Sequence, residues 1–322
     1  MRLLVLSRNS ALYSTSRLVL AARARGHHVS VADPLDFQIA ISRGKPEMFL
    51  GKRPIPDADM VIPRIGASIT NYGLAVVRQF DMMGIPVLNT AVAIARSRDK
   101  LRSMQLLTRK DIDVPKTVCA RSPESVERAL QFIGGAPAIV KLQQGAQGIG
   151  TMIAETPQAV TSLLETLWAM GQDIILQEYI AESRGRDYRA IVVGNRVIAA
   201  MRRQAKAGEF RSNLHRGGLG VRVELDKRFS SAAIAATKVM GLEVAGVDLL
   251  EGRDGPKILE INSSPGLEGI ERTSGVDVAG AIIQHAEKRL TRRAKRRDTV
   301  IEEERRVRRI RDAGGPRSHA SR

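Results

Sequence analysis

Alternation between short apolar runs and segments with helical periodicity is the feature that most constrains the fold of this chain. Four apolar runs in the first hundred residues predict buried strands, at 3–7, 28–32, 60–62 and 86–88. Two predicted helices lie between them, at 12–25 and about 71–83, each followed by a glycine. Such alternation indicates an open α/β sheet. Because residues 7–14 lack the glycines of a dinucleotide-binding turn, we expect a small Rossmann-like layer without dinucleotide over residues 1–97.

A second domain is predicted over residues 98–290, where strands and helices continue to mix. Apolar runs predict strands at 114–118, 138–142, 174–177, 188–193, 197–202, 244–250 and 257–262. Helical patterns cover 99–110, a segment starting near 122, and the ranges 157–170, 228–240 and 276–290. The first of these helices has Asp99 at its start and basic residues at its end, which matches the helix dipole.

The formal net charge of +17 is unevenly distributed along the chain. From Lys288 to Arg322 there are 14 Lys or Arg against 5 Asp or Glu, so about half of the excess lies in the last tenth. This basic tail, residues 291–322, has two interpretations. It is either a solvated extension, helical or disordered, or a segment that contacts the ribosome or RNA.

Several classes of protein are excluded by composition. The single cysteine, Cys119, cannot form an internal disulfide and suits a reducing cytoplasm. No apolar run resembles a signal peptide or reaches the roughly 20 residues needed to span a bilayer. We therefore expect a cytoplasmic protein without membrane contact. Aromatic residues make up 3% of the chain, which argues against a stacking platform for single-stranded nucleic acid.

Three side chains with oxygen atoms occur in two neighbouring predicted strands. Glu260 and Asn262 are two residues apart and therefore project from one face of their strand. If the hairpin is centred at Asp254, Asp248 lies directly across from Glu260 on that same face. Buried like charges destabilise a fold unless a cation holds them, and Mg²⁺ favours one or two carboxylates together with phosphate oxygens. We interpret the set as a metal site; the alternative is a solvated polar face on an edge hairpin.

Two further segments suit phosphate binding. Lys141 ends a predicted strand and precedes the glycine-rich segment 145–150, whose backbone N–H groups could approach phosphate oxygens. It is neither a Walker loop nor a Rossmann turn, and a plain hairpin turn fits it about as well. The basic run 202–206 continues through 210–218 and suits a loop that encloses a polyanion, or alternatively a solvated surface loop.

Together these stretches resemble the ATP-grasp superfamily, and within it the RimK-type ligases. The resemblance is nearly chain-long and is carried by the runs 61–66, 93–105, 210–218 and 262–271. It implies a pre-ATP-grasp domain followed by a two-lobed ATP-grasp fold. Two departures are visible: the family often has alanine where Ser263 stands, and its tail is usually short.

Carried over by position, the resemblance implies a role for each matching residue. Contacts to the ATP phosphates would come from Lys100 and Lys141. The strand end that holds adenine, largely through backbone groups, would be Gln177, Glu178, Tyr179 and Ile180. The ribose-side carboxylate would be Asp187, and the nucleotide-binding loop would supply Arg211, Ser212 and Asn213. The magnesium ligands would be Asp248, Glu260 and Asn262, in agreement with the hairpin argument.

The implied activity is that of an ATP-dependent carboxylate–amine ligase with two Mg²⁺ or Mn²⁺ ions. It would add L-glutamate to the C-terminus of a small-subunit ribosomal protein through an acyl-phosphate, as a homo-oligomer. Charge on the transferring phosphoryl group would be spread by Arg203, Lys206 and Arg211, and the acidic acceptor would meet Arg64, Tyr72 and Arg203. Two alternatives stay open: the same fold making free poly-α-glutamate or using another amino acid, and a ribosome- or RNA-binding regulator with incidental ATP binding.

Overall fold

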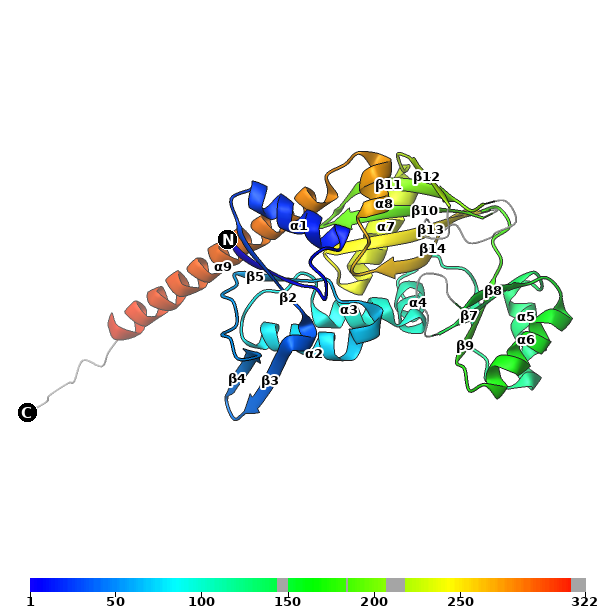
Figure 1. Cartoon of the computed structure of the whole chain (residues 1–322), viewed down its shortest axis with the longest axis horizontal. Coiled ribbons are helices and arrows are strands. Elements are labelled where there is room, and N and C mark those ends of the chain that lie inside the picture. Colours follow the sequence, from blue (N-terminus) through cyan, green and yellow to red (C-terminus); the bar gives the residue numbers. More distant parts are fainter. Residues whose placement is uncertain (144–149, 184, 207–217, 314–322) are drawn as a thin grey trace, which may run out of the picture.

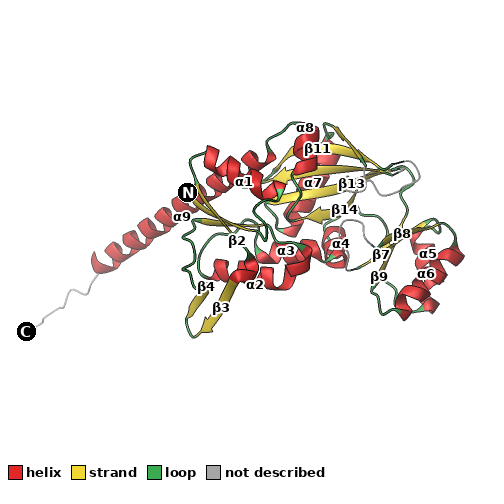
Figure 2. Cartoon of the chain, in the orientation of Figure 1, coloured by secondary structure: helices red, strands yellow, loops and turns green. Residues whose placement is uncertain are grey.

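The protein folds into an N-terminal layer, a small lobe and a large sheet, as a computed structural model of the chain shows (Figures 1 and 2). The structure describes residues 1–143, 150–183, 185–206 and 218–313. Within these ranges the strands form sheets of three, four and five strands and one separate two-stranded hairpin. The predicted mixture of helices and strands is confirmed.

The N-terminal layer has the predicted α/β sheet, whose three strands are parallel and lie in the order β2-β1-β5. Its elements are β1 (Arg2–Leu6), α1 (Tyr13–Ala24), β2 (His28–Ala32), β5 (Met60–Pro63) and α2 (Thr70–Met82). The strand predicted at 86–88 is wrong. Val87 makes only an isolated bridge to Val61, because Pro86 has no N–H to donate and the chain then turns into α3 (Ala91–Arg98).

A hairpin that the sequence interpretation missed projects from this layer (Figure 1). It consists of β3 (Phe37–Ser42) and β4 (Lys45–Leu50), paired antiparallel around a turn at Gly44. At the base of the hairpin, the buried ring of Phe37 packs edge-on against the ring of Phe80 in α2, with 5.4 Å between the ring centroids.

The small lobe is a four-stranded antiparallel sheet with two helices (Figure 1). In the order of the sheet its strands are β6 (Thr117–Val118), β9 (Ile174–Glu178), β7 (Ala138–Leu142) and β8 (Thr151–Ala154). The helices are α5 (Val126–Ile133) and α6 (Pro157–Ala169). Helix α6 begins at the predicted residue, Pro157, and the side chain of Thr156 caps it by accepting from the Ala159 N–H.

The large sheet has five antiparallel strands. Their order is β12 (Leu219–Arg222), β11 (Arg196–Gln204), β10 (Arg186–Val193), β13 (Val244–Gly252) and β14 (Gly255–Asn262). One face packs against α7 (Lys227–Met240), and the hydrophobic core between them also contains Leu107 of α4 (Lys100–Thr108). The other face shares a core with β1 and β5, α8 (Glu268–Ser274) and α9 (Val278–Ala313). The N-terminal layer is thus packed directly onto the sheet that carries the predicted metal ligands.

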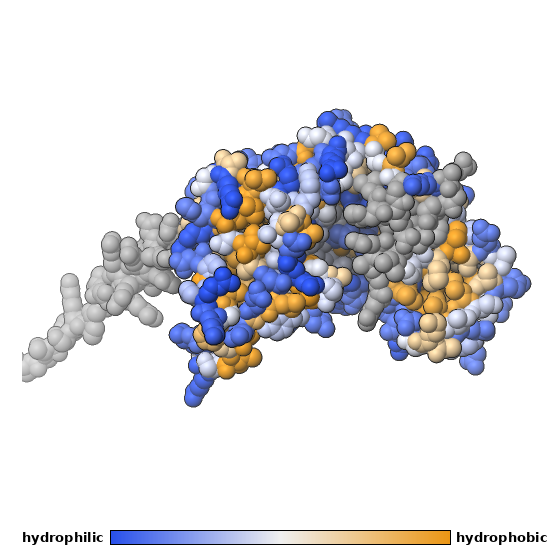
Figure 3. Space-filling model, viewed as in Figure 1, coloured by the Kyte–Doolittle hydropathy of each residue, from blue (hydrophilic) through white to orange (hydrophobic). Residues whose placement is uncertain are grey.

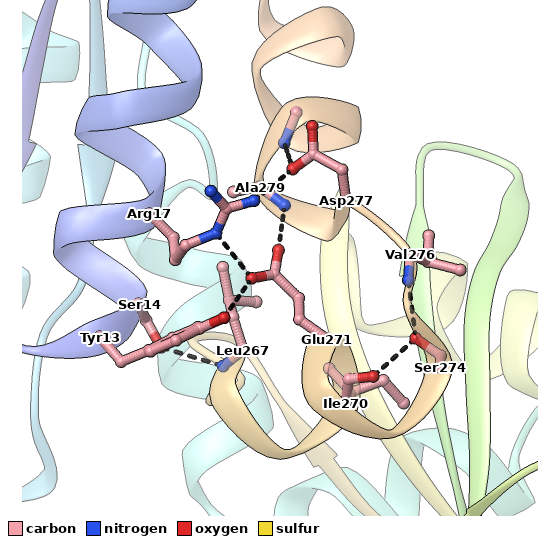
Figure 4. A network of polar contacts seen from close by, with 11 residues as sticks. Tyr13, Ser14, Arg17, Leu267, Ile270, Glu271, Ser274, Val276, Asp277 and Ala279 are labelled. Carbon is pink, nitrogen blue, oxygen red and sulfur yellow. Dashed lines mark hydrogen bonds and ion pairs between the residues drawn. The ribbon is translucent and has the colours of Figure 1, made fainter.

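A polar network joins α1 to the start of α8 and α9 (Figure 4). The buried carboxylate of Glu271 accepts from the Tyr13 hydroxyl at 3.0 Å and from Arg17 Nε at 2.9 Å. Arg17 also donates to Asp277, and the Ser14 hydroxyl accepts from the Leu267 N–H at 2.9 Å. These contacts fix the segment that follows β14 against the N-terminal layer.

The last helix, α9, leaves the body of the protein beyond its first turns (Figure 1). Arg289 and Arg293 still donate to the carbonyls of Val87 and Gly84. The tail is expected to be either helical or disordered. Residues 291–313 are helical, and residues 314–322 lie outside the described residues. In the described ranges, none of the helices combines the length and apolarity needed to cross a bilayer.

Candidate functional site

The predicted pairing of Asp248 with Glu260 is confirmed. These residues are direct partners in the β13–β14 ladder, and Gly246 is paired with Asn262. The hairpin turns at Arg253-Asp254, whereas the predicted turn is centred on Asp254 alone. This difference would pair Asp248 with Leu259, but a bulge at Leu259 shifts the register by one residue, so that Asp248 pairs with Glu260 as predicted. Gly246 is required here, since a Cβ at this position would lie 2.7 Å from Cβ of Pro265.

One face of the large sheet changes from apolar to charged along its strands. In β10, alternate residues put Val193 and Ile191 into the shared core and Arg189 and Asp187 beyond it. In β11, Arg203 follows the core residue Met201 by two positions and is therefore on the same face. The site is the polar continuation of a hydrophobic face.

Asp248 is buried, and arginines bind both of its oxygens. Arg189 Nε and Nη2 donate to Oδ1 and Oδ2 at 2.7 and 2.6 Å, and Arg203 Nη2 lies 3.1 Å from Oδ2. Burial alone would raise the pKa of Asp248, but the two guanidiniums outweigh it and hold that pKa below its usual value. The sequence argument took the required cation to be a metal ion. In the structure two arginines neutralise this carboxylate, so its burial does not by itself require a metal ion, and its role as a metal ligand stays a prediction.

Asp187 is also buried, and Arg203 donates to both of its oxygens through Nε and Nη2. Burial raises the pKa of Asp187, although the ion pair with Arg203 acts in the opposite direction. Burial also tends to lower the pKa of Arg203, but the Asp187 and Asp248 carboxylates outweigh it and hold that pKa above its usual value. In this arrangement Asp187 orients the guanidinium. Its contact with a ribose stays a prediction.

Glu260 faces two lysines from other elements. Its side chain is exposed to solvent, yet dense surrounding protein desolvates it and raises its pKa, and the Asp248 carboxylate adds to the effect. Lys141, at the end of β7, has a pKa lowered to about 8 by burial, with Lys100 contributing and Glu260 opposing. Burial likewise lowers the pKa of Lys100, whose Nζ donates to the Leu142 carbonyl at 3.0 Å.

The strand end of β9 is linked to these lysines. Gln177 is buried, and its Oε1 accepts from Lys141 Nζ at 2.5 Å. The Glu178 carboxylate accepts from the Lys116 N–H and forms an ion pair with Lys257 of β14 at 3.3 Å, which connects the two lobes. Tyr179 and Ile180 follow, half-buried and buried. The side chain of Glu178 is therefore engaged with protein, which agrees with a predicted adenine contact through backbone groups.

The donor set fits a divalent cation next to a phosphate. Asp248, Glu260 and Asn262 supply hard oxygens on one face of a hairpin. Asn262 Nδ2 is buried without a hydrogen-bond partner in the described part of the chain, so a bound phosphate oxygen would satisfy it. The described residues contain no group of three or more His, Cys, Asp or Glu that could hold a metal, so such a site depends on the asparagine and on ligand oxygens.

Several predicted residues lie apart from this cluster. Arg211, Ser212 and Asn213 fall outside the described residues, as does most of the glycine-rich segment. Lys206 is exposed at the end of the described segment 185–206. Arg64 donates to the Pro265 carbonyl at 2.7 Å, close to the end of β14, and burial lowers its pKa to about 10. The Tyr72 hydroxyl donates to the Phe37 carbonyl, within the N-terminal layer.

The sequence interpretation missed two residues that shape the site. Arg189 lies two positions after Asp187 in β10, and knowledge that β10 is next to β13 would have found it. Asn89 is buried and binds the backbone at both Val244 and Ser263. Nothing in its local sequence indicates this, because its partners are more than 150 positions away.

Two family models match the chain. The RimK PreATP-grasp domain matches residues 1–94, and the RimK-like ATP-grasp domain matches residues 97–286. A probable alpha-L-glutamate ligase of Ectopseudomonas mendocina (strain ymp) is 54% identical over 288 residues, which cover 89% of this chain and 96% of the relative.

Solved structures share the fold. The ATP-grasp ligase PsnB complexed with minimal precursor, Mg and ADP has a TM-score of 0.69 at 21% identity, covering 88% of this chain and 96% of its own. The D-alanine–D-alanine ligase from Bacillus anthracis complexed with ATP has a TM-score of 0.67 at 17% identity, covering 92% and 99%. The two-lobed architecture behind a pre-ATP-grasp domain is thereby confirmed. The chain therefore belongs to the RimK-like ATP-grasp family of ATP-dependent ligases.

Proposed function

We propose that this protein uses ATP and Mg²⁺ or Mn²⁺ to add L-glutamate to the C-terminus of a small-subunit ribosomal protein. The relatives named as probable alpha-L-glutamate ligases support the amino acid. One structural observation carries the reaction class: the Asp248–Glu260 pair with Asn262 on the large sheet, facing the partly buried Lys100 and Lys141. Oxygen ligands on one side and lysines on the other suit a metal-bound triphosphate.

In this proposal the chain's residues hold the nucleotide. Lys100 and Lys141 bind its phosphates, and the strand end from Gln177 to Ile180 holds adenine. Asp248, Glu260 and Asn262 would hold the divalent cations, which when bound neutralise charge on the terminal phosphates. Among the described residues, Nη1 of Arg203 makes no hydrogen bond or ion pair, whereas Nε and Nη2 are bound by carboxylates. This nitrogen, with Lys206 and Arg211, is suited to stabilise the transferring group.

The reaction then proceeds in two steps. An oxygen of the acceptor carboxylate attacks the γ-phosphorus, the bond to the β-phosphate oxygen breaks, and an acyl-phosphate and ADP form. The amine of L-glutamate attacks the acyl carbon, phosphate leaves, the nitrogen loses a proton and an amide forms. Arg64, beside Pro265, supplies a cation for the acidic acceptor at this end of the sheet.

Purified protein with ATP, Mg²⁺ and each amino acid, with and without the ribosomal protein, tests the proposal. With glutamate we expect ADP release and successive glutamyl mass increments on the acceptor. With the other amino acids we expect neither. Equal ADP release with non-acidic amino acids would rule out glutamate as the substrate. Glutamate-dependent ADP release without acceptor would indicate synthesis of free poly-α-glutamate.

A second candidate function rests on the basic tail, because the match to the relative covers 89% of this chain and α9 continues as a helix to Ala313. A protein truncated after Leu290 should keep its ligase turnover. If the tail binds ribosomes or RNA, the truncated protein should lose co-sedimentation that is steeply salt-dependent in the full chain. Unchanged co-sedimentation would dismiss this role.

A further inference from the structure

An open pocket of about 600 Å³, called the β6–α5 cavity below, lies on the small lobe between the edge strand β6 and helix α5. Its lining includes Val118, Cys119, Arg121, Ser125, Arg128 and Phe132. None of these residues belongs to the nucleotide or metal site described above. The volume falls within the range of about 300–1,000 Å³ that is typical of small-molecule sites.

The lining combines two cations with an apolar surface. Arg121 forms an ion pair with Asp173, which compensates its charge. Arg128 is exposed and has no hydrogen bond or ion pair to any residue that the structure describes. The Phe132 side chain is 58% exposed, although it is large and apolar. On the visible face of the small lobe, hydrophobic side chains gather into a patch with a hydrophilic border (Figure 3). An uncompensated guanidinium beside an exposed ring favours a ligand with both an anionic and an apolar part.

The wall of the cavity is joined to the nucleotide site through side chains. Thr117 lines the cavity, and its Oγ1 accepts from Gln177 Nε2 at 2.9 Å. The other end of the same amide, Oε1, accepts from Lys141 Nζ at 2.5 Å. From the side of α6, Trp168 Nε1 donates to the carbonyl of Ala120, another lining residue. A displacement of β6 would therefore move Gln177 and the lysine that it holds.

We propose that this cavity binds a small molecule with one anionic group and an apolar or aromatic group, and that its occupancy alters nucleotide affinity through Thr117, Gln177 and Lys141. The anionic group, a phosphate or a carboxylate, pairs with Arg128, and the apolar group covers Phe132. Because linkage is reciprocal, nucleotide binding changes the affinity of the cavity by the same factor. This proposal goes beyond the ligase reaction and does not depend on which amino acid is added.

Binding is tested on the full chain by calorimetry with three probes: phenyl phosphate, phenylacetate and inorganic phosphate. We expect one of the two aromatic anions to bind more tightly than inorganic phosphate, and the better probe identifies the anionic group. Arg128→Gln should weaken it by about tenfold, the loss of one charged hydrogen bond. The matched control is Arg43→Gln, an exposed arginine in the β3–β4 turn, which should change nothing. No binding of either aromatic probe, equal binding by the Arg128 variant, or complete displacement by ATP would overturn the site.

Coupling is tested separately by measuring the ATP dissociation constant with and without a saturating aromatic probe. We expect a shift of several-fold, which Thr117→Val should abolish while the probe still binds, because valine keeps the shape and removes the hydroxyl. An ATP affinity that is unchanged by the probe would refute the coupling. Loss of ligase activity in an unliganded Arg128 variant would also contradict it, because Arg128 has no part in the reaction.

Discussion

Asn89 offers the most direct test of how the N-terminal layer supports the site. Its side chain is 3% exposed and makes four hydrogen bonds to the backbone. Nδ2 donates to the carbonyls of Val244 at 2.8 Å and Ser263 at 3.0 Å, while Oδ1 accepts from the N–H groups of Glu243 at 2.8 Å and Val244 at 3.0 Å. Val244 begins β13, and Ser263 directly follows Asn262. One amide therefore holds the start of β13 and the end of β14, the two strands that carry the proposed metal ligands.

Replacing Asn89 by leucine keeps the approximate size and removes all four bonds. At about 1 kcal/mol each, their loss costs roughly 4 kcal/mol, and the backbone groups left buried without partners cost more. Total stability of a domain is about 5–15 kcal/mol, so the variant should fold but be markedly weakened. The free energy of unfolding is measured by urea denaturation followed by circular dichroism. The control is Asn71→Leu on α2, an exposed asparagine without a described side-chain hydrogen bond.

The same variant should require more Mg²⁺ for half-maximal ADP release, because Asn262 and Asp248 lose their common anchor. A purely structural role for Asn89 would lower stability and leave the Mg²⁺ requirement of the folded fraction unchanged. If Asn89→Leu loses less than about 1 kcal/mol, or no more than Asn71→Leu, the reasoning from these four bonds is refuted.

Three further predictions concern the site and the core. Glu260→Gln should lower ADP release by about 100-fold or more at fixed Mg²⁺, since it removes a charged ligand of the proposed metal site; unchanged turnover and metal dependence would contradict that site. In the proposed function the protonated form of Lys141 binds phosphate. Since the pKa of Lys141 is about 8, ATP affinity should then fall as pH rises through that value. Calorimetry at pH above 8 in buffers of different ionisation enthalpy should show proton uptake on binding, absent in Lys141→Met. Phe80→Ala should lower the free energy of unfolding by about 3–5 kcal/mol, because its ring is fully buried against Phe37; a loss below 1 kcal/mol in urea denaturation would contradict this.

Local patterns were sufficient to predict most single elements. The strands at His28–Ala32 and Ala138–Leu142 occupy the predicted residues, since an apolar run between turn residues has few other interpretations. The β3–β4 hairpin was missed, although Phe37, Ile39 and Ile41 put a large apolar side chain at every second position, and this spacing is typical of a strand. The Asp248–Glu260 pairing was also predictable, because a hairpin determines its own register.

The sequence did not reveal which distant strands are neighbours. Arg189 and Arg203 reach Asp248 only because β10 lies between β11 and β13, and about 40 residues separate β11 from β13 along the chain. Propensity and periodicity describe one segment at a time, so they give no sheet order. The same reason explains Asn89, whose four bonds all involve distant residues.

The charges of the cluster bear on how a cation could bind. Three carboxylates, Asp187, Asp248 and Glu260, lie near four cationic side chains, Arg189, Arg203, Lys100 and Lys141. The free site thus has an excess of positive charge, and both oxygens of Asp248 are already bound by guanidiniums. A divalent cation alone would increase that excess, whereas one that arrives with a polyanionic triphosphate would not. We therefore expect Mn²⁺ to bind weakly to the free protein and tightly once a non-hydrolysable ATP analogue is present. Tight binding of Mn²⁺ without nucleotide, measured by electron paramagnetic resonance, would show that the arginines yield Asp248 to the metal and that the charge argument fails.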